Sequence, residues 1–204
     1  MIVLYSHMEE FTFDWRVWMA LASVVITFVA VFPYVLSTLR RKTRPDFVTW
    51  FLWSLTSGIG AIAQWASGAS WSLSVVAANA LATGVIALLA LRFGIKRYTK
   101  LDTLCMALAI GAVFLWLATD DPLVALVLAI ATDFLAALPT ISKSYAHPAS
   151  ERAWTYFAFA VAAFFGILAG GVFDAANLAY PLYFVCLYSA IGILAAHHRR
   201  RRNL

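Results

Sequence analysis

One acidic residue, Asp133, lies deep inside an apolar stretch of the sequence, six residues before Pro139. At 1.5 Å per helical residue these two positions are roughly 9 Å apart along a helix, which places the carboxyl group toward the middle of its segment. Inside a membrane such an acid could carry a proton or a cation, or accept a hydrogen bond from a substrate. A protonated carboxyl bonded to a neighbouring helix is the alternative, and both interpretations stay open.

Two asparagines stand in similar surroundings, Asn79 in "VAANALATG" and Asn177 in "DAANLAYPL". Each follows a pair of alanines in an apolar segment, so we expect both side chains to line one shared cavity. The alternative is hydrogen bonding between helices, which polar residues in membrane helices supply at about 1 kcal/mol.

Other polar and aromatic side chains complete the candidate substrate site. Thr27 precedes Pro33 by six residues, as Asp133 precedes Pro139. A threonine hydroxyl that bonds its own helix backbone is the favoured alternative for Thr27. Gln64 lies near the end of its segment, where it could also meet interfacial water.

Flat aromatic side chains and prolines suggest two further roles. Trp53 and Tyr180 could stack on a sugar or a heterocycle, although aromatic packing between helices is more common. Each of Pro33, Pro139 and Pro181 removes a helical hydrogen bond and kinks its helix, which would suit a hinge. The alternative for these prolines is a static kink.

The elements that must position these residues are membrane-spanning helices. The chain of 204 residues is 63% hydrophobic and 12% charged, whereas soluble domains are about one quarter charged. A span needs roughly 20 apolar residues. Apolar runs bounded by charged or turn residues predict an all-α integral membrane protein with seven spans, at 17–39, 47–66, 72–92, 102–118, 122–141, 153–171 and 175–196.

Charged residues separate by side along these spans. Basic residues fill every second loop and the tail. The opposite side carries acidic residues in the N-terminal segment, between the fourth and fifth spans and between the sixth and seventh, and no charged residue between the second and third. By the positive-inside rule, the N-terminus is outside and the C-terminus is cytoplasmic, in what we expect to be a bacterial inner membrane. The basic clusters suit anionic lipid headgroups rather than nucleic acid.

A repeat is visible between "AVFPYVLSTLRR" at 30–41 and "AALPTISKSYAH" at 136–147. Pro33 and Pro139 both lie near the cytoplasmic end of a span that enters from outside. Two parallel copies of a three-helix unit need one inverting helix between them, so the chain divides as 3+1+3. The expected parts are an outer segment 1–16, a first repeat 17–92, a linker helix 101–118, a second repeat 122–196 and a basic tail 197–204.

These features resemble the PQ-loop and SWEET transporter superfamily over about residues 17–196, through "VFPYVLSTLRRKTRP", "ALPTISKSYAHP" and the two asparagines. The resemblance implies that Asn79 and Asn177 flank a central substrate site and that Pro33 and Pro139 are bending points. The sequence departs from the family where tyrosine and threonine follow these prolines in place of glutamine, and where Pro45 and Pro148 fall in loops.

The expected function is a small-molecule transporter or facilitator for a neutral polar solute such as a sugar, nucleoside or vitamin. A cationic amino acid stays possible because of Asp133. The alternative is a membrane sensor, receptor or assembly factor without a transport path. We expect no enzyme activity, cofactor or metal site, since the spans lack a nucleophile with a base and lack clustered ligands. The sequence defines no oligomeric state.

Overall fold

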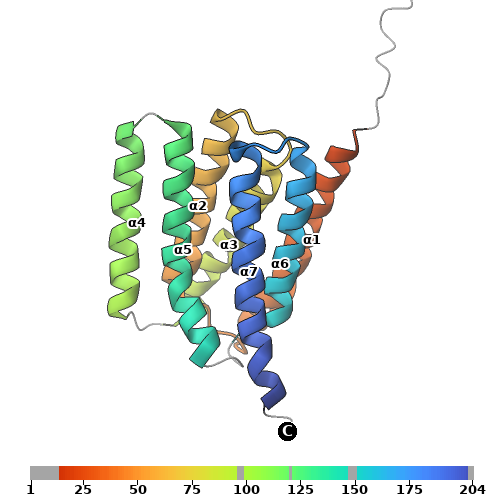
Figure 1. Cartoon of the computed structure of the whole chain (residues 1–204). Helices are drawn as coiled ribbons and strands as arrows, with labels where there is room; N and C mark the ends of the chain where they lie inside the picture. Colours follow the sequence, from red (N-terminus) through yellow and green to blue (C-terminus); the bar gives the residue numbers. More distant parts are fainter. Residues whose placement is uncertain (1–13, 96–98, 120, 147–150, 202–204) are drawn as a thin grey trace, which may run out of the picture.

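The computed structural model describes residues 14–95, 99–119, 121–146 and 151–201, and all of its regular elements are helices (Figure 1). The helices are α1 (Trp15–Leu39), α2 (Phe47–Ala66), α3 (Leu73–Phe93), α4 (Lys100–Thr119), α5 (Pro122–Ala146), α6 (Ala153–Gly170) and α7 (Ala175–Arg201). The all-α prediction is confirmed, and each predicted range overlaps one helix.

Some of the sequence-based predictions concern residues outside the described ranges. Most of the acidic N-terminal segment, with Glu9 and Glu10, is among them, as are Lys96, Asp120 and Pro148. Within the described ranges, α5 continues to Ala146 and so extends beyond the predicted end at residue 141. The helix extends beyond the apolar run because the polar residues after Pro139 still form helical backbone hydrogen bonds.

Five of the helices are long and apolar enough to cross a membrane: α1, α3, α5, α6 and the Ala175–Ala196 part of α7. Large apolar side chains cover their outer faces, and Phe32, Leu81 and Leu88 are each more than 60% exposed. Such a surface suits lipid rather than water. The chain is therefore an integral membrane protein. The helix α2 falls outside this set of five because its hydroxyl, amide and tryptophan side chains lower its hydropathy.

The helix contacts follow one pattern twice. Among the first three helices, α3 contacts both α1 and α2; among the last three, α7 contacts both α5 and α6. Two further contacts, α1 with α6 and α2 with α5, join these groups, and α4 packs on the outside against α5 (Figure 1). We call α1–α3 the first group and α5–α7 the second group.

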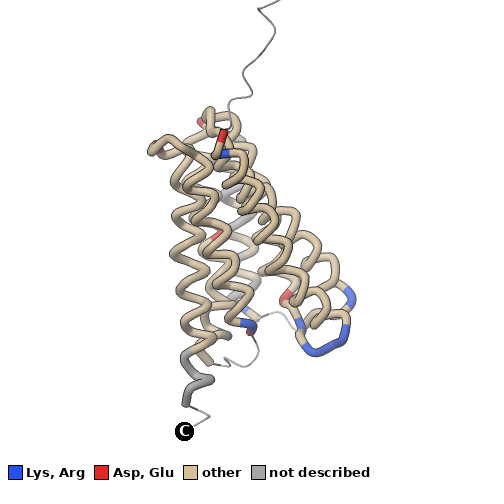
Figure 2. Tube along the Cα trace, turned by 90° about the vertical axis from the view of Figure 1, so that its right-hand side faces the viewer, with Lys and Arg blue, Asp and Glu red and all other residues tan. Residues whose placement is uncertain are grey.

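Charge differs between the two ends of the bundle. Lysine and arginine gather at the lower end in Figure 2, and one acidic position lies about midway along the bundle. Acidic residues at the opposite end cap helices: the Asp14 carboxylate accepts a hydrogen bond from the Arg16 amide, and Asp121 accepts one from the Leu123 amide. A carboxylate at a helix N-terminus satisfies amides that have no partner in the helix. We call these the basic end and the acidic end.

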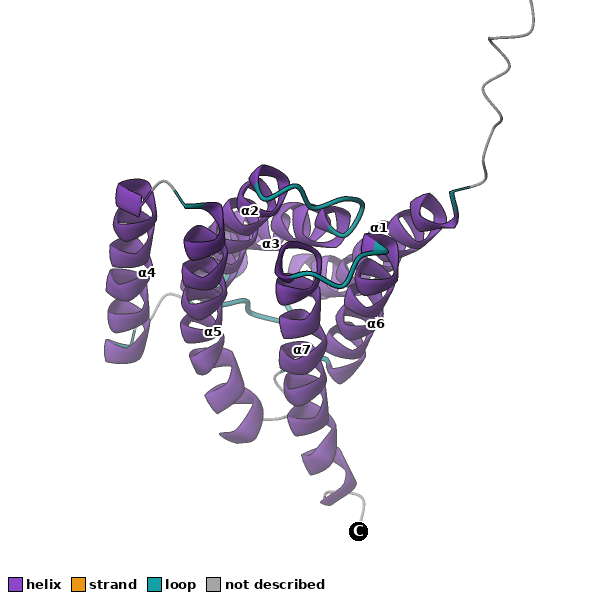
Figure 3. Cartoon of the chain, turned by 45° about the horizontal axis from the view of Figure 1, so that its top comes forward, coloured by secondary structure: helices purple, strands orange, loops and turns teal. Residues whose placement is uncertain are grey.

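Pro33, Pro139 and Pro181 all lie inside helices that continue past them. Helix α5 bends in its lower part (Figure 3). A proline inside a helix removes one backbone hydrogen bond and kinks the chain, which is the ordinary cause of such a bend. The hinge role of the three prolines stays a prediction.

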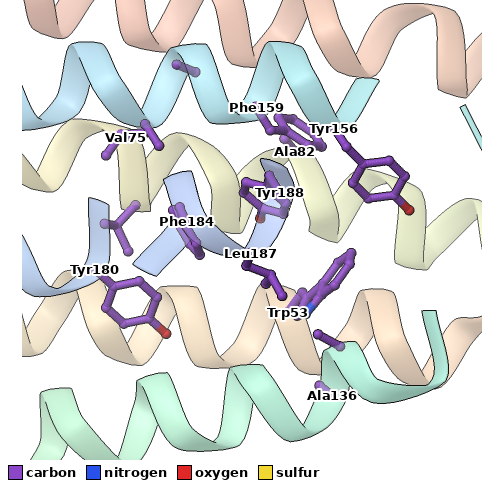
Figure 4. Packing of buried hydrophobic residues seen from close by; sticks show 14 of the residues in the cluster. Trp53, Val75, Ala82, Ala136, Tyr156, Phe159, Tyr180, Phe184, Leu187 and Tyr188 are labelled. Carbon is purple, nitrogen blue, oxygen red and sulfur yellow. The ribbon is translucent and has the colours of Figure 1, made fainter. Parts of the chain in front are cut away.

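Aromatic side chains form the centre of the bundle (Figure 4). Tyr188 packs with its ring centroid 6.1 Å from that of Trp53 and 5.1 Å from that of Phe159. Trp50 belongs to the same core: it is 3% exposed, and its ring lies 5.2 Å from that of Trp53. Trp50 lies in the first turn of α2, and its side chain faces the bundle rather than lipid.

Candidate functional site

The Asp133 carboxyl group is fully buried between three helices and is held by hydroxyl groups. The Tyr183 hydroxyl, from α7, donates to Oδ2 at 2.8 Å, and Thr56 Oγ1, from α2, forms a hydrogen bond with Oδ1. The backbone carbonyl of Asp133 also accepts a hydrogen bond from Trp53 Nε1 at 3.3 Å. The acid therefore connects α5 to one helix of the first group and one helix of the second.

Tyr180 extends this arrangement. Its hydroxyl donates to the Thr56 carbonyl at 3.0 Å, and both side chains are buried. We call Asp133, Thr56, Tyr183, Trp53 and Tyr180 the Asp133 cluster. Two residues of the predicted substrate site, Trp53 and Tyr180, thus lie in one cluster with Asp133. Their stacking on a ligand stays a prediction.

No cation stands beside the carboxyl group in the described part of the chain. The ion pairs that the structure contains there join Arg16 to Asp14 and Lys143 to Glu151. An ionised carboxylate without a cationic partner is costly to bury. Asp133 can therefore keep its charge only when a cation or strong hydrogen-bond donors reach it.

The single hydrogen of the Thr56 hydroxyl allows two arrangements of the hydrogen bonds around Asp133. Its Oγ1 lies 2.8 Å from the Leu52 carbonyl and also contacts Asp133, but a hydroxyl carries one hydrogen. When Thr56 donates to Leu52, the hydrogen between Thr56 and Asp133 must belong to the carboxyl group. When Asp133 is ionised, Thr56 can rotate and donate to it. The site can thus accommodate Asp133 with or without its proton.

Asn79 lies in α3, and its side-chain partners Ser57 and Tyr188 are not members of the Asp133 cluster. Its Nδ2 donates to Ser57 Oγ at 2.9 Å, and its Oδ1 accepts from the Tyr188 hydroxyl at 2.9 Å. Asn79 is 2% exposed, so both ends of its amide are used inside the bundle. This is the interhelical hydrogen bonding that the sequence left open as the alternative.

Asn177 lies at the acidic end, three residues into α7. Its Oδ1 accepts hydrogen bonds from Ser70 and Ser72 in the loop between α2 and α3. Its backbone N–H and its Nδ2 both donate to Asp174 Oδ1, at 2.8 and 2.9 Å. These two bonds hold the pKa of the exposed Asp174 below its ordinary value of 3.8, and the backbone bond contributes more than the side-chain bond.

Among the described residues, Asn79 and Asn177 have no hydrogen-bond partner in common. Counted from the start of each helix, Asn79 is the seventh residue of α3 and Asn177 the third of α7, about one turn apart in depth. The matching sequence phrases therefore fall at different positions along α3 and α7. A shared cavity between the two asparagines stays a prediction.

Gln64 is fully buried, unlike a residue at a wet interface. Its Nε2 donates to the Ala176 carbonyl at 2.6 Å, whereas its Oε1 has no partner. Thr27 is also buried, and its hydroxyl donates to the Ser23 carbonyl four residues earlier at 2.9 Å. That backbone bond is the arrangement the sequence favoured for Thr27.

Thr56 and Tyr183 are the two cluster residues that sequence reasoning missed. Helical spacing held a partial signal: Tyr180, Phe184 and Tyr188 recur every four residues in α7 and mark its buried face, beside which Tyr183 lies. A hydroxyl such as that of Thr56 is common in membrane helices, so its type alone did not distinguish it.

Comparison with models of known protein families, with curated proteins and with solved structures returned no match.

Proposed function

We propose that this protein is a small-molecule transporter or facilitator that works by alternating access between two three-helix repeats. The first repeat is the first group, α1–α3, and the second is the second group, α5–α7. Helix α4 links them. This arrangement is the 3+1+3 architecture of the PQ-loop and SWEET-like proteins that the sequence resembles.

The matched contacts of the two groups support the repeat. Two pairs of residues that are 106 positions apart also play related roles. The first pair is Pro33 and Pro139, and the second is Gly60 and Gly166. Gly60 in α2 lets the Tyr180 ring of α7 approach its backbone, and Gly166 in α6 does the same for Val75 of α3. Close approach at small residues is typical of packed membrane helices. Each contact crosses from one group to the other, as a two-fold arrangement requires.

The buried Asp133 carboxyl group is the single observation that carries the transport proposal. It lies where α2 of one group meets α5 and α7 of the other, and its partners among the described residues are hydroxyl groups. Acids inside membrane segments commonly serve ion or substrate pathways, and transporter sites lie at repeat interfaces near the midplane. Relative movement of the two groups would change the partners of Asp133 and hence its affinity for a proton or a cationic group.

The substrate we propose is a neutral polar solute, with a cationic amino acid as the second possibility. Hydroxyl, carboxyl and aromatic groups of the Asp133 cluster can bond and stack on either. The protein is placed with its acidic end outside and its basic end in the cytoplasm, where anionic lipid headgroups would contact the basic loops.

The test begins with a substrate screen and ends with flux. Thermal stability of the purified protein is measured against sugars, nucleosides, amino acids and vitamins, because a ligand at 100 times its Kd adds about 2.7 kcal/mol. Uptake of the stabilising solute into proteoliposomes is then measured under a proton gradient. Asp133→Asn is expected to abolish uphill uptake and to spare exchange.

Asp121→Asn is the matched control, since Asp121 is an exposed cap at the start of the same helix. Uphill uptake that is unchanged in Asp133→Asn would remove the proposed role of the acid. A folded wild-type protein that binds and moves none of the solutes would favour the alternative.

That alternative is a membrane sensor or assembly factor that keeps the bundle without a transport path. The hydrogen bonds of the two asparagine side chains favour this alternative, because Asn79 and Asn177 form them with other groups of the protein. Residues with purely structural bonds need no substrate to explain them.

A further inference from the structure

A network of hydrogen bonds joins the two groups at the acidic end. The loop at residues 67–72, between α2 and α3, lies against the junction of α6 and α7. There Asn177 Oδ1 accepts from the Ser70 amide at 3.0 Å and from Ser72 Oγ at 2.7 Å. One amide oxygen of the second group thus holds two donors of the first.

Two further bonds cross the same boundary. Ser70 Oγ donates to the Gly170 carbonyl at 2.8 Å, and Gln64 Nε2 donates to the Ala176 carbonyl at 2.6 Å. Gly170 also makes room for the contact: a Cβ there would lie 3.2 Å from Asn177 Cβ and 3.3 Å from Ser72 Cβ. The absence of a side chain at residue 170 therefore lets the loop sit directly on α7.

The basic end is bonded differently. There Glu151 accepts from Lys143 Nζ at 2.7 Å and from the Tyr156 hydroxyl at 2.9 Å, and all three residues belong to the α5–α6 region of the second group. Ser37 and Thr43, in the first group, bond each other at 2.6 Å. The helices also diverge toward this end in Figure 2.

We propose that the 67–72 loop and Asn177 form the outer gate of the transport path, and that this gate is closed in the structure. We call these contacts the Asn177 latch. The gating role rests on the transport function proposed above. Opening toward the outside requires the first group to leave the α6–α7 junction, which breaks the bonds to Asn177, Gly170 and Ala176 together.

The chemistry of the latch suits reversible opening. Its bonds join neutral groups, and Ser70 is only partly buried at the end of the bundle. Water can replace such partners when the loop lifts, so each bond changes the ratio of closed to open forms only roughly fivefold. A charged pair buried at this position would be harder to separate.

The test measures the gap across the latch by double electron-electron resonance. Spin labels are placed at Trp71→Cys and Phe173→Cys, which are 47% and 86% exposed on the two sides of the latch. Cys105 and Cys186 are first replaced by alanine. Distances are recorded without substrate for the parent, for Asn177→Ala and for Ser72→Ala.

Ser74→Ala is the matched control, because Ser74 follows the loop closely but its buried hydroxyl has no hydrogen-bond partner in the described parts of the chain. Ser72→Ala is expected to raise the ratio of long to short distances roughly fivefold, and Asn177→Ala to raise it further. Ser74→Ala is expected to match the parent. If Asn177→Ala does not fold, Ser72→Ala decides, since it keeps the bonds of Asn177 to Asp174.

Distances in Ser72→Ala and Asn177→Ala that equal those of Ser74→Ala would overturn the latch, whether or not the protein transports. If the distances lengthen in Ser72→Ala and Asn177→Ala but the protein transports no solute, the latch is supported and the transport proposal is contradicted. The two proposals therefore fail on different measurements.

Discussion

At the scale of single residues, the protein holds its two best-defined carboxyl groups in opposite ways. Asp133 is buried and bonded by the hydroxyls of Thr56 and Tyr183, so its partners serve either protonation state. Asp174 is exposed and accepts two N–H bonds from Asn177, which are stronger when the carboxylate is ionised. The Asp133 contacts can therefore form whether or not the acid carries a proton, whereas the Asp174 contacts weaken when Asp174 is protonated.

The behaviour of Asp174 gives a pH prediction. Its pKa is lowered in the folded protein, so the cap on α7 contributes stability above the ordinary value of 3.8 and loses it as pH falls through the lowered pKa. We expect the stability difference between wild type and Asp174→Ala to be constant at every pH well above 3.8 and to shrink below it. Thermal unfolding in detergent across pH measures this difference. A difference that changes around neutral pH would contradict the assignment.

At the scale of helices, small residues decide how closely the two groups approach. Gly60 is the clearest case, because a Cβ at this position would overlap the Tyr180 ring. That ring is fully buried, and its hydroxyl is fixed by the Thr56 carbonyl. The contact between α2 and α7 therefore depends on the missing side chain.

Gly60→Ala is expected to lower the free energy of unfolding by about 1–3 kcal/mol, as overpacking of a filled core does. Gly58 is the control two residues away in α2, since a Cβ there meets nothing within 4 Å. Gly58→Ala should be neutral or stabilising by up to about 1 kcal/mol, because alanine favours helix over glycine. Chemical unfolding in detergent compares the two variants, and equal effects would show that the Tyr180 contact is not tight.

At the scale of the whole molecule, the separation of charge between the two ends sets the orientation that we propose. Single cysteines at Phe173→Cys, in the exposed α6–α7 loop, and at Lys42→Cys, in the exposed α1–α2 connection, report the two ends. In intact cells a membrane-impermeant thiol reagent should label the first, and the second only after permeabilisation. The native cysteines are replaced beforehand, and the reverse pattern would contradict the orientation.

Local information in the sequence determined the helices, because a helix closes its backbone hydrogen bonds within itself and a long apolar run can bury only in lipid or in a bundle. The rarity of acids in such runs singled out Asp133, and the basic loops predicted an orientation. Boundaries were less certain, as the continuation of α5 to Ala146 shows, because charged residues can extend a helix beyond the apolar run.

Only the tertiary structure decided which side chains meet. The partners of Asp133 are 77 and 50 residues away, at Thr56 and Tyr183. Successive residues in a helix point about 100° apart, so a small change in rotation or depth replaces every contact. For that reason the sequence did not place Trp50 in the core or distinguish the structural bonds of Asn79 from those of Asn177. Those depend on how whole helices pack, which no single segment determines.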